Sequence, residues 1–525
     1  MFACPNCGGN LKFDIPSQQL ACEYCHTQAD PYSFEDKDEE SFAKQEYEVT
    51  VFTCPQCGGE IVSTDTSAAE FCTFCGASTI LHSRLIKEKR PNYIIPFKKT
   101  KEDCKKAYTS MMKKAIFAPD GLKNPKYIDS FRGIYMPYWA FFMTQENGFS
   151  LKGTKSYRRG NYVYTDHYEL TGDIDAYYKG LSYDASSSFD DCISEKIAPY
   201  DVKGMKAFTP AYLSGFYADT ADVDASIYEN DAAQVAIENT TERLYKERAF
   251  AGYTISSANS SSVPTRTEAV DSTMFPVWFM SYRNGDRVAY ATVNGQTGKV
   301  VTDLPIDPRK YLFGSLALAV PIFVLLNLFF TVIPSVLLII TAFLALIANI
   351  IYSYEISSIL KKEQGTEDKG RLAKETPEMA SYVKKSKKIS IKGNKSSRVT
   401  SIMVFVFVLF MVLSVFGPVI TMIDFNILWI VLLVVTFISS FIGFRKKNEY
   451  SDKKKAFGFV TSIIAVIIGA AIALIHPVSD LFYYGGAIVS LLAVFYTIKD
   501  IIYYYNILST RRLPQFDRTG GDDRA

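Results

Sequence analysis

The chain has 525 residues, enough for about three or four domains, and its 48% of hydrophobic residues concentrate after about residue 310. Its net charge of only +2 excludes a general basic field for nucleic acid. Eight of the ten cysteines fall in CxxC pairs, which favours metal sites over a disulfide framework. The amino terminus lacks a basic and apolar signal segment, so we expect the part before residue 310 to stay in the cytosol.

The first element in chain order is a repeated cysteine pattern of CxxC, fourteen residues and CxxC, at an offset of 50 residues. The ligand candidates are Cys4, Cys7, Cys22 and Cys25, then Cys54, Cys57, Cys72 and Cys75. Two such knuckles complete a tetrahedral thiolate site, and the residues between them suffice for a short β-hairpin. We therefore predict two small β zinc ribbons, at residues 1–29 and 50–82, each with one structural zinc ion. Iron in a rubredoxin-like site is the alternative, and four sulfurs without an open position disfavour catalysis at either metal.

The pattern after the first ribbon changes twice. Residues 30–49 are acidic and predict a solvated linker or a short exposed helix, with partner docking as the alternative role. Residues 90–308 alternate short aromatic strands with turn residues and contain two helical stretches. One helix begins with a capping box at Thr100, and the other is expected over 222–250. Together these elements predict a cytosolic α+β domain.

This domain offers no constellation of catalytic residues. The segment GQTGK at 295–299 lacks the spacing of a phosphate loop and lies in a predicted hairpin, which argues against nucleotide binding. His167 is the only histidine of the domain and is expected to be a surface or sheet residue. Cys104 and Cys192 lack a histidine partner motif and are expected to be packing residues. Enzymatic activity is therefore undecided, with none expected.

Six uncharged apolar runs follow. The stretch 311–354 has no Asp, Glu, Lys or Arg, and at about 1.5 Å per residue it is about twice as long as one bilayer crossing, so Pro334 is expected to divide it. The predicted spans are Leu312–Phe330, Pro334–Tyr352, Val399–Ile423, Phe425–Phe444, Ala456–Ser479 and Leu481–Ile498. They pair into hairpins at 311–354, 399–444 and 456–501, which predicts an all-α membrane domain of six spans. No ionisable residue lies deep in these runs, which favours an anchor or assembly surface over a charge pathway.

The loops between the hairpins are basic. Lysine and arginine crowd into 355–398 and 445–455, whereas the hairpin tips carry none. This asymmetry predicts a multi-pass protein of the cell membrane whose amino terminus, basic loops and tail at 502–525 are all cytoplasmic. Candidates for contact with anionic lipid are Lys384, Lys385, Lys387, Lys388 and Lys392, with a purely topological role as the alternative.

Several soluble motifs carry a resemblance to a known family. They are the paired CPxCGG and CxxC ribbons, YMPYW at 135–139, TPAYLSGFYAD at 209–219, PVWFMSY at 276–282 and VNGQTGKVV at 293–301. With these motifs, about residues 1–310 resemble the TFIIB-type zinc-ribbon membrane proteins of Gram-positive bacteria. Some relatives are similar to partners of phage-shock-type envelope-stress proteins, so the resemblance implies a scaffold that holds soluble partners at the inner membrane face. Two ribbons in one chain depart from the single-ribbon relatives.

The chain as a whole thus predicts a membrane-anchored, non-enzymatic adaptor or scaffold. Its expected partners are the lipid bilayer and a cytosolic or membrane protein, and a homo-oligomer is left open. The alternative is a transporter or channel regulated by its ribbon domain. A membrane-tethered nucleic-acid-binding ribbon is disfavoured, because the linker is acidic where phosphate contacts need lysine or arginine.

Overall fold

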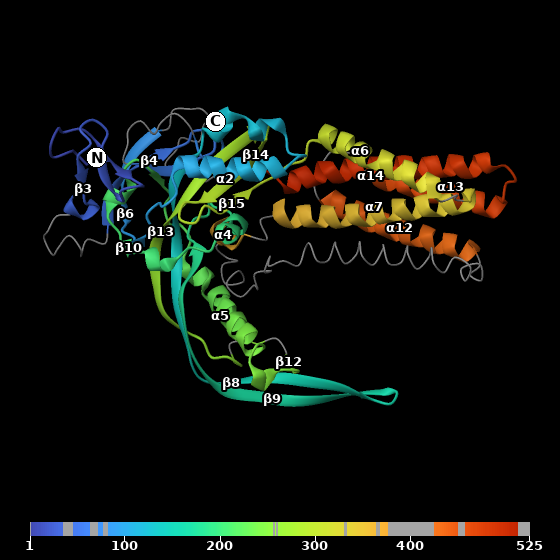
Figure 1. Ribbon diagram of the computed structural model, residues 1–525, viewed down its shortest axis with the longest axis horizontal. Coiled ribbons are helices and arrows are strands. Elements are labelled where there is room, and N and C mark those ends of the chain that lie inside the picture. The colour runs from blue at the N-terminus through green and yellow to red at the C-terminus, as the bar shows by residue number, and fades with distance from the viewer. Residues whose placement is uncertain are drawn as a thin grey trace.

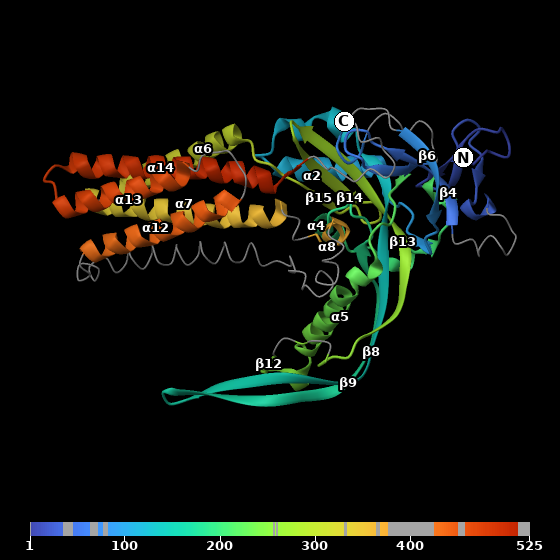
Figure 2. The same cartoon turned by 180° about the vertical axis from the view of Figure 1, so that it is seen from behind.

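The computed structural model describes residues 2–34, 46–63, 72–76, 82–255, 258, 261–329, 333–363, 368–375, 425–449 and 457–512. Strands and short helices form a head, made of the described residues up to 307, and long apolar helices form a bundle beside it along the longest axis (Figure 1). A two-stranded arm leaves the head and bends toward the side on which the bundle lies (Figures 1 and 2).

The first cysteine repeat folds into its own three-stranded antiparallel sheet, β1 (Leu11–Asp14), β2 (Gln19–Cys22) and β3 (Gln28–Ala29), followed by the 3-10 turn η1 (Pro31–Phe34). Side chains alternate between buried and half-buried along β1, as a half-buried strand requires. The Phe13 ring packs edge-on against Tyr212 at 5.1 Å, and Ser214 donates a hydrogen bond to the Leu11 carbonyl at 2.5 Å. This small sheet is therefore held against the rest of the head.

The second cysteine repeat is built into the large sheet of the head. Its strands are β4 (Glu46–Thr53), β5 (Glu60–Ser63) and β6 (His82–Lys89), and β4 pairs with both others. β5 also pairs with β11 (Tyr217–Ala218), which runs parallel to β8 (Arg132–Arg159). The two repeats, equal in cysteine spacing, therefore have different structural surroundings.

The large sheet has thirteen strands, and its main path is β10-β7-β13-β8-β11-β5-β4-β6. The remaining strands are β7 (Tyr93–Ile94), β9 (Tyr162–Asp184), β10 (Lys206–Ala207), β12 (Thr254–Ile255), β13 (Arg266–Asn284), β14 (Arg287–Asn294), β15 (Val300–Thr302) and β16 (Arg511–Arg512). The similar segments YMPYW at 135–139 and MFPVW at 274–278 are antiparallel neighbours, since Met274 lies opposite Pro137 and Pro276 opposite Tyr135. β16 comes from the end of the chain and pairs with β14.

Short helices cover the sheet of the head. They are α2 (Lys101–Lys114), α3 (Pro125–Ile128), α4 (Asp191–Ile197) and α5 (Glu229–Leu244), with 3-10 turns η3 (Asp120–Lys123), η4 (Val202–Gly204), η5 (Pro210–Leu213), η6 (Ala225–Ile227) and η7 (Arg248–Phe250). The capping box predicted at Thr100 is present, because its side chain accepts from the Asp103 N–H and the Asp103 carboxylate accepts from the Thr100 N–H. α5 is shorter than the predicted 222–250.

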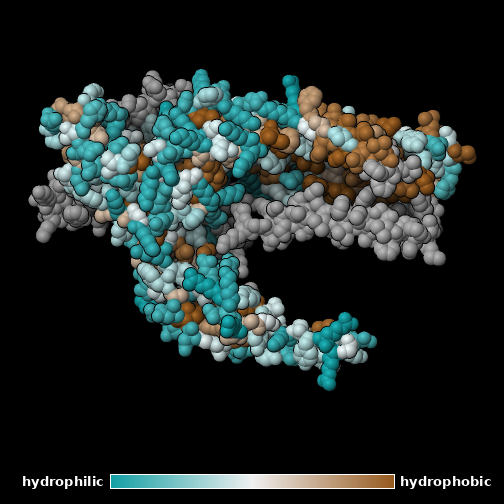
Figure 3. All heavy atoms as spheres, in the orientation of Figure 1, coloured by the Kyte–Doolittle hydropathy of each residue, from teal (hydrophilic) through white to brown (hydrophobic). Residues whose placement is uncertain are grey.

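The bundle contains five helices that are long and apolar enough to cross a membrane among the described residues, and its surface is strongly hydrophobic in Figure 3. They are α6 (Pro308–Phe329), α7 (Pro334–Glu363), α12 (Phe425–Glu449), α13 (Phe457–Ile475) and α14 (Asp480–Leu508). The predicted span Val399–Ile423 and the five candidate lipid-contact lysines lie outside the described residues. Both α7 and α14 continue beyond the predicted ends of their spans, and α8 (Lys369–Glu375) follows α7.

Small residues allow the bundle helices to approach closely. A Cβ added at Gly469 would collide with the Trp429 ring, and one at Gly486 would lie 2.8 Å from a Leu338 methyl. A Cβ at Gly485 would meet nothing within 4 Å. Of these three glycines, Gly469 and Gly486 are therefore packing positions.

Candidate metal centres and the junction between head and bundle

The first candidate metal centre lies at the edge of the small ribbon sheet. Cys4, Cys7, Cys22 and Cys25 place their Sγ atoms within 4.8 Å of one another. The first knuckle closes through hydrogen bonds from Cys4 N–H to Gly9 O at 2.7 Å and from Gly8 N–H to Cys4 O at 2.9 Å, with Gly8 at φ +74°. Hydrogen bonding to the Thr27 side chain and backbone lowers the pKa of Cys25 to about 6, which favours the thiolate that metal binding needs.

The second candidate centre is enclosed by the large sheet. Cys54, Cys57, Cys72 and Cys75 bring their Sγ atoms equally close together, and all four residues are buried. The knuckle repeats the first one, with Cys54 N–H donating to Gly59 O at 2.9 Å and Gly58 at φ +74°. Around the cysteines pack Phe52, Ile61 and Phe74. Tyr290 of β14 donates a hydrogen bond to the Phe74 carbonyl at 2.8 Å, which ties this centre to the middle of the head.

Both clusters offer four thiolates and thus suit a metal ion that prefers tetrahedral sulfur ligation. With a metal ion bound, four protein ligands would leave no position for a reactive water, an arrangement typical of structural sites. Within the described residues they are the two groups of three or more histidine, cysteine or acidic side chains placed to hold a metal ion. Their exposure differs, since Cys7 is exposed whereas its counterpart Cys57 is 4% exposed.

The carboxyl end of α14 is fastened to the head by side chains that cap it. Arg287 of β14 donates to the carbonyls of Ile507 at 2.7 Å and Thr510 at 2.9 Å. A cation that satisfies the last carbonyls of a helix also interacts favourably with the helix dipole. One residue before Ile507, the Asn506 side chain exchanges hydrogen bonds with the backbone of Ile306 at 2.7 and 2.9 Å.

The residues after α14 extend this joint. Arg511 pairs with Asp190 at the start of α4, and its Nε lies 3.5 Å from the Asp303 carboxylate after β15. The guanidinium also lies over the Tyr290 ring, 5.4 Å from its centroid. Burial of Asp190 works toward a higher pKa, but the charges of Arg511 and Lys362, together with hydrogen bonds from Arg511 and the Ile193 N–H, outweigh it and hold the pKa of that carboxyl below its ordinary value. The joint therefore combines strand pairing, helix capping and a buried ion pair.

A second connection follows α7. Lys369, at the start of α8, forms an ion pair with Asp231 of α5 at 2.7 Å, and the two side chains are only 5% and 10% exposed. The Lys369 N–H donates to the Asp191 carboxylate at 2.9 Å. Two bundle helices thus continue into segments that bind the head.

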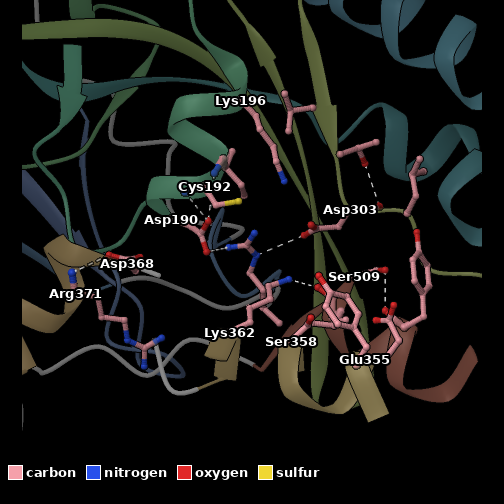
Figure 4. A pocket seen from close by; sticks show the side chains of 18 residues that line it. Asp190, Cys192, Lys196, Asp303, Glu355, Ser358, Lys362, Asp368, Arg371 and Ser509 are labelled. Carbon is pink, nitrogen blue, oxygen red and sulfur yellow. Dashed lines mark hydrogen bonds and ion pairs between the residues drawn. The ribbon is translucent and has the colours of Figure 1, made fainter. Parts of the chain in front are cut away.

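A cavity of about 530 Å³ lies between head and bundle at this joint. In Figure 4, Cys192 and Lys196 extend from α4 into the cavity and face Ser358 and Lys362 of α7. Its charged lining residues are Asp190, Lys196, Asp303, Glu355, Lys362, Asp368, Arg371 and Arg511. Burial raises the pKa of the Cys192 thiol, so this cysteine lacks the thiolate character of a reactive nucleophile.

The other singled-out groups occupy separate places. GQTGK forms the turn between β14 and β15. The side-chain amide oxygen Oδ1 of Asn294, just before it, accepts hydrogen bonds from two backbone N–H groups of the turn. Cys104 is fully buried in α2, and His167 is exposed on the arm. These positions bring neither cysteine nor the histidine to the cysteine clusters.

Sequence reasoning missed Asp500, because it ended the last span at Ile498. Asp500 is 4% exposed, and its carboxylate accepts a hydrogen bond from the Gly458 N–H at 3.1 Å, at the start of α13. A carboxylate at a helix amino terminus is stabilised by the helix dipole. The signal that could have found it is the tyrosine-rich apolar pattern that continues after Asp500 to Leu508.

The described structure is that of a membrane protein with two Cys4 groups that could bind metal ions. Comparison with known proteins found a similar chain in Bacillus subtilis (strain 168), the uncharacterized protein YdjG, which is 29% identical over 316 residues. These residues are 59% of this chain and 91% of that protein, and because only 215 residues follow residue 310, the similarity includes part of the head. No family model matches the chain, and no solved structure matches it.

Proposed function

We propose that this protein is a membrane-anchored adaptor with one zinc ion in each Cys4 group and its head on the cytosolic side. Zinc suits closed sets of four thiolates, and a reducing compartment keeps such thiolates available. The head would present a surface to a protein partner while the bundle holds it at the bilayer.

The observation that carries this proposal is the joint between head and bundle. An adaptor must hold its docking surface at a defined position relative to the membrane. Here Arg287 of the head binds the end of α14, and Arg511, which follows α14, pairs with Asp190 of the head. Lys369 after α7 is buried against α5. Because separating these groups would leave several charges without partners, the head is held in one orientation on the bundle.

The first ribbon is the best candidate for the docking surface. It lies at the end of the head opposite the bundle (Figure 1), and Tyr24 on it is 78% exposed. An exposed tyrosine gives a large contact area at low entropic cost. The second ribbon, enclosed by the sheet, would serve mainly to fold the head.

The test is a crosslinked purification of the full chain from its native membrane, with metal content measured on each sample. The wild type is compared with Cys7→Ser, which breaks the exposed ribbon, and with Tyr24→Ala, which leaves the metal in place. A partner that is captured by the wild type and lost from both variants, at equal membrane levels, supports the adaptor. Repeated absence of a captured protein from the wild type counts against it.

A second candidate function, transport through the bundle, rests on a polar seam between α7 and α12. Asn349 is fully buried and donates to the Ser440 hydroxyl at 2.7 Å, and Ser353 donates to the Ser439 carbonyl at 2.9 Å. Hydrogen bonds between such polar groups also stabilise the packing of membrane helices without any transport. Flux through proteoliposomes that is altered by Asn349→Leu would support transport, and a flux identical to that of empty vesicles across a broad substrate panel would oppose it.

A further inference from the structure

The arm consists of residues 145–176, where β8 pairs with β9 beyond the last pairing of β8 with β13 at Thr144. Its base is supported by an apolar cluster that includes Phe149, Leu151, Leu170, Ile237 and Val263. Beyond this cluster, every residue from Lys155 to Glu169 is exposed. We call this stretch, 155–169, the arm tip. Strand pairing shapes it around a two-residue turn that begins with Gly160 at φ +64°, and Tyr253 contacts only its base, through Tyr168 and Lys155.

The arm tip carries large side chains that a purely solvated hairpin would not need. Residues directly opposite in an antiparallel pair share one face, so Tyr157 and Tyr164 lie together, and their rings stack at 5.6 Å. Tyr162 lies on the same face next to the turn and is 73% exposed. Val163, on the opposite face, is 69% exposed. Apolar and aromatic groups gathered at an exposed tip indicate a surface that contacts a membrane or another molecule.

The charges of the arm tip are mostly positive. Arg158 and Arg159 directly precede the turn, with Arg159 opposite Tyr162 and Arg158 opposite Val163. Lys155 lies farther back, opposite Asp166, and Glu169 is the tip residue farthest from the turn. Tyrosines combined with arginines and lysines are typical of the membrane interface, where rings sit at headgroup level and long cationic side chains reach phosphates. The composition therefore complements an anionic phospholipid surface.

The direction of the arm brings this tip toward the membrane. In both Figure 1 and Figure 2 the outer part of the arm runs alongside the bundle, on the same side of the head. A bilayer crossed by the bundle helices must extend sideways from them. In both views the arm tip reaches beside the bundle, past its end nearer the head, so such a bilayer would meet the outer arm from the leaflet nearer the head, at a distance from the bundle itself.

From these observations we infer that the arm tip docks on anionic phospholipid of the leaflet nearer the head. Tyr157, Tyr162 and Tyr164 lie in the interface, while Arg158 and Arg159 bind lipid phosphates. The bundle and the arm tip together then give the head two separate points of attachment, which fixes its rotation about the bundle. This inference is independent of any partner of the ribbons.

The test uses the full chain in vesicles of phosphatidylglycerol and phosphatidylcholine, with the photo-crosslinking analogue p-benzoylphenylalanine in place of Tyr162. The matched control carries the analogue in place of Tyr24, an equally exposed tyrosine at the far end of the head. Mass spectrometry of the illuminated protein separates phospholipid adducts from crosslinks to protein. We expect lipid adducts at position 162 and none above background at position 24.

The second part of the test measures how docking depends on charge. Each lysine or arginine near an anionic surface changes local binding by about fivefold, so Arg158→Gln with Arg159→Gln should weaken docking by about 25-fold and reduce the adducts at position 162 accordingly. Vesicles of phosphatidylcholine alone should have the same effect. Crosslinks to a second copy or another protein in place of lipid, or equal lipid adducts at positions 162 and 24, would overturn the inference.

Discussion

Replacing Arg511 by methionine tests whether the tail after α14 holds the head on the bundle. The methionine keeps an apolar stem but removes the charge that faces Asp190 and Asp303. The three side chains are 16%, 26% and 14% exposed, in that order, so the carboxylates are left with limited access to water. The substitution therefore removes one partner of a largely buried charge cluster.

The expected cost follows from this burial. Breaking a fully buried ion pair costs about 3–5 kcal/mol. Because about a quarter of the Asp190 side chain is accessible to water, we expect a smaller loss of about 2–3 kcal/mol in the free energy of tail docking. At 1.4 kcal/mol for each factor of ten, the undocked state becomes about 30 to 150 times more populated.

Hydrogen exchange of the full chain in lipid nanodiscs measures this population. Amides in the β14–β16 pairing should exchange faster by about that factor in Arg511→Met, since they exchange when the tail undocks. Arg512→Met is the control, because Arg512 is adjacent and exposed, and it should change exchange by less than about threefold. Equal exchange in the two variants would refute the assignment of the joint to Arg511.

Three further outcomes follow from the same structure. Cys57→Ser should lose one bound metal ion per chain and lower the unfolding temperature of the head. Cys7→Ser should also lose one metal ion but with little thermal effect, because only Cys57 is enclosed by the large sheet; equal thermal shifts would contradict this. Gly469→Ala should destabilise the bundle by about 1–3 kcal/mol, because the added methyl group overlaps a tryptophan ring, whereas Gly485→Ala should be nearly neutral. Thermal unfolding in detergent measures both variants, and a larger destabilisation by Gly485→Ala would contradict the packing. The pKa of Asp190 is depressed in the folded state, so its contribution to the stability of tail docking is present above its unfolded pKa of about 4 and is lost as pH falls through the folded value. Protection of the tail amides, corrected for intrinsic exchange, should therefore stay constant from about pH 7 to 5. A loss of protection in that window would argue against the pairing.

Features that depend on local chemistry were predictable from the sequence. Metal coordination fixes the spacing within each knuckle, so the eight predicted cysteines come together in two clusters. The capping box at Thr100 and the hairpin that begins at Asn294 depend on residues only a few positions apart. Apolar runs long enough to cross a bilayer likewise predicted five helices of the bundle.

Features that depend on long-range pairing were not predictable in this way. Arg511 and Asp190 are 321 positions apart, and neither has a neighbouring motif that indicates the other. Because the two cysteine repeats have the same spacing, the sequence predicted the same small ribbon for both. In the structure, however, β5 joins the second ribbon to the large sheet through β11. The helix ends were misplaced for a related reason, since Asp500 marks the end of an apolar run but its carboxylate finds a partner at the start of another helix.

The joint also constrains how either proposed function could operate. Arg287 binds the last carbonyls of α14, and Arg511 follows within one turn, so any movement of that helix must displace groups inside the head. For an adaptor this coupling keeps the ribbons at a fixed position above the bilayer. For a transporter the same coupling would carry a movement of the bundle to the ribbons. The two functions therefore differ in whether the joint moves, and exchange at the β14–β16 pairing, compared with and without partner or transported substrate, reads that movement directly.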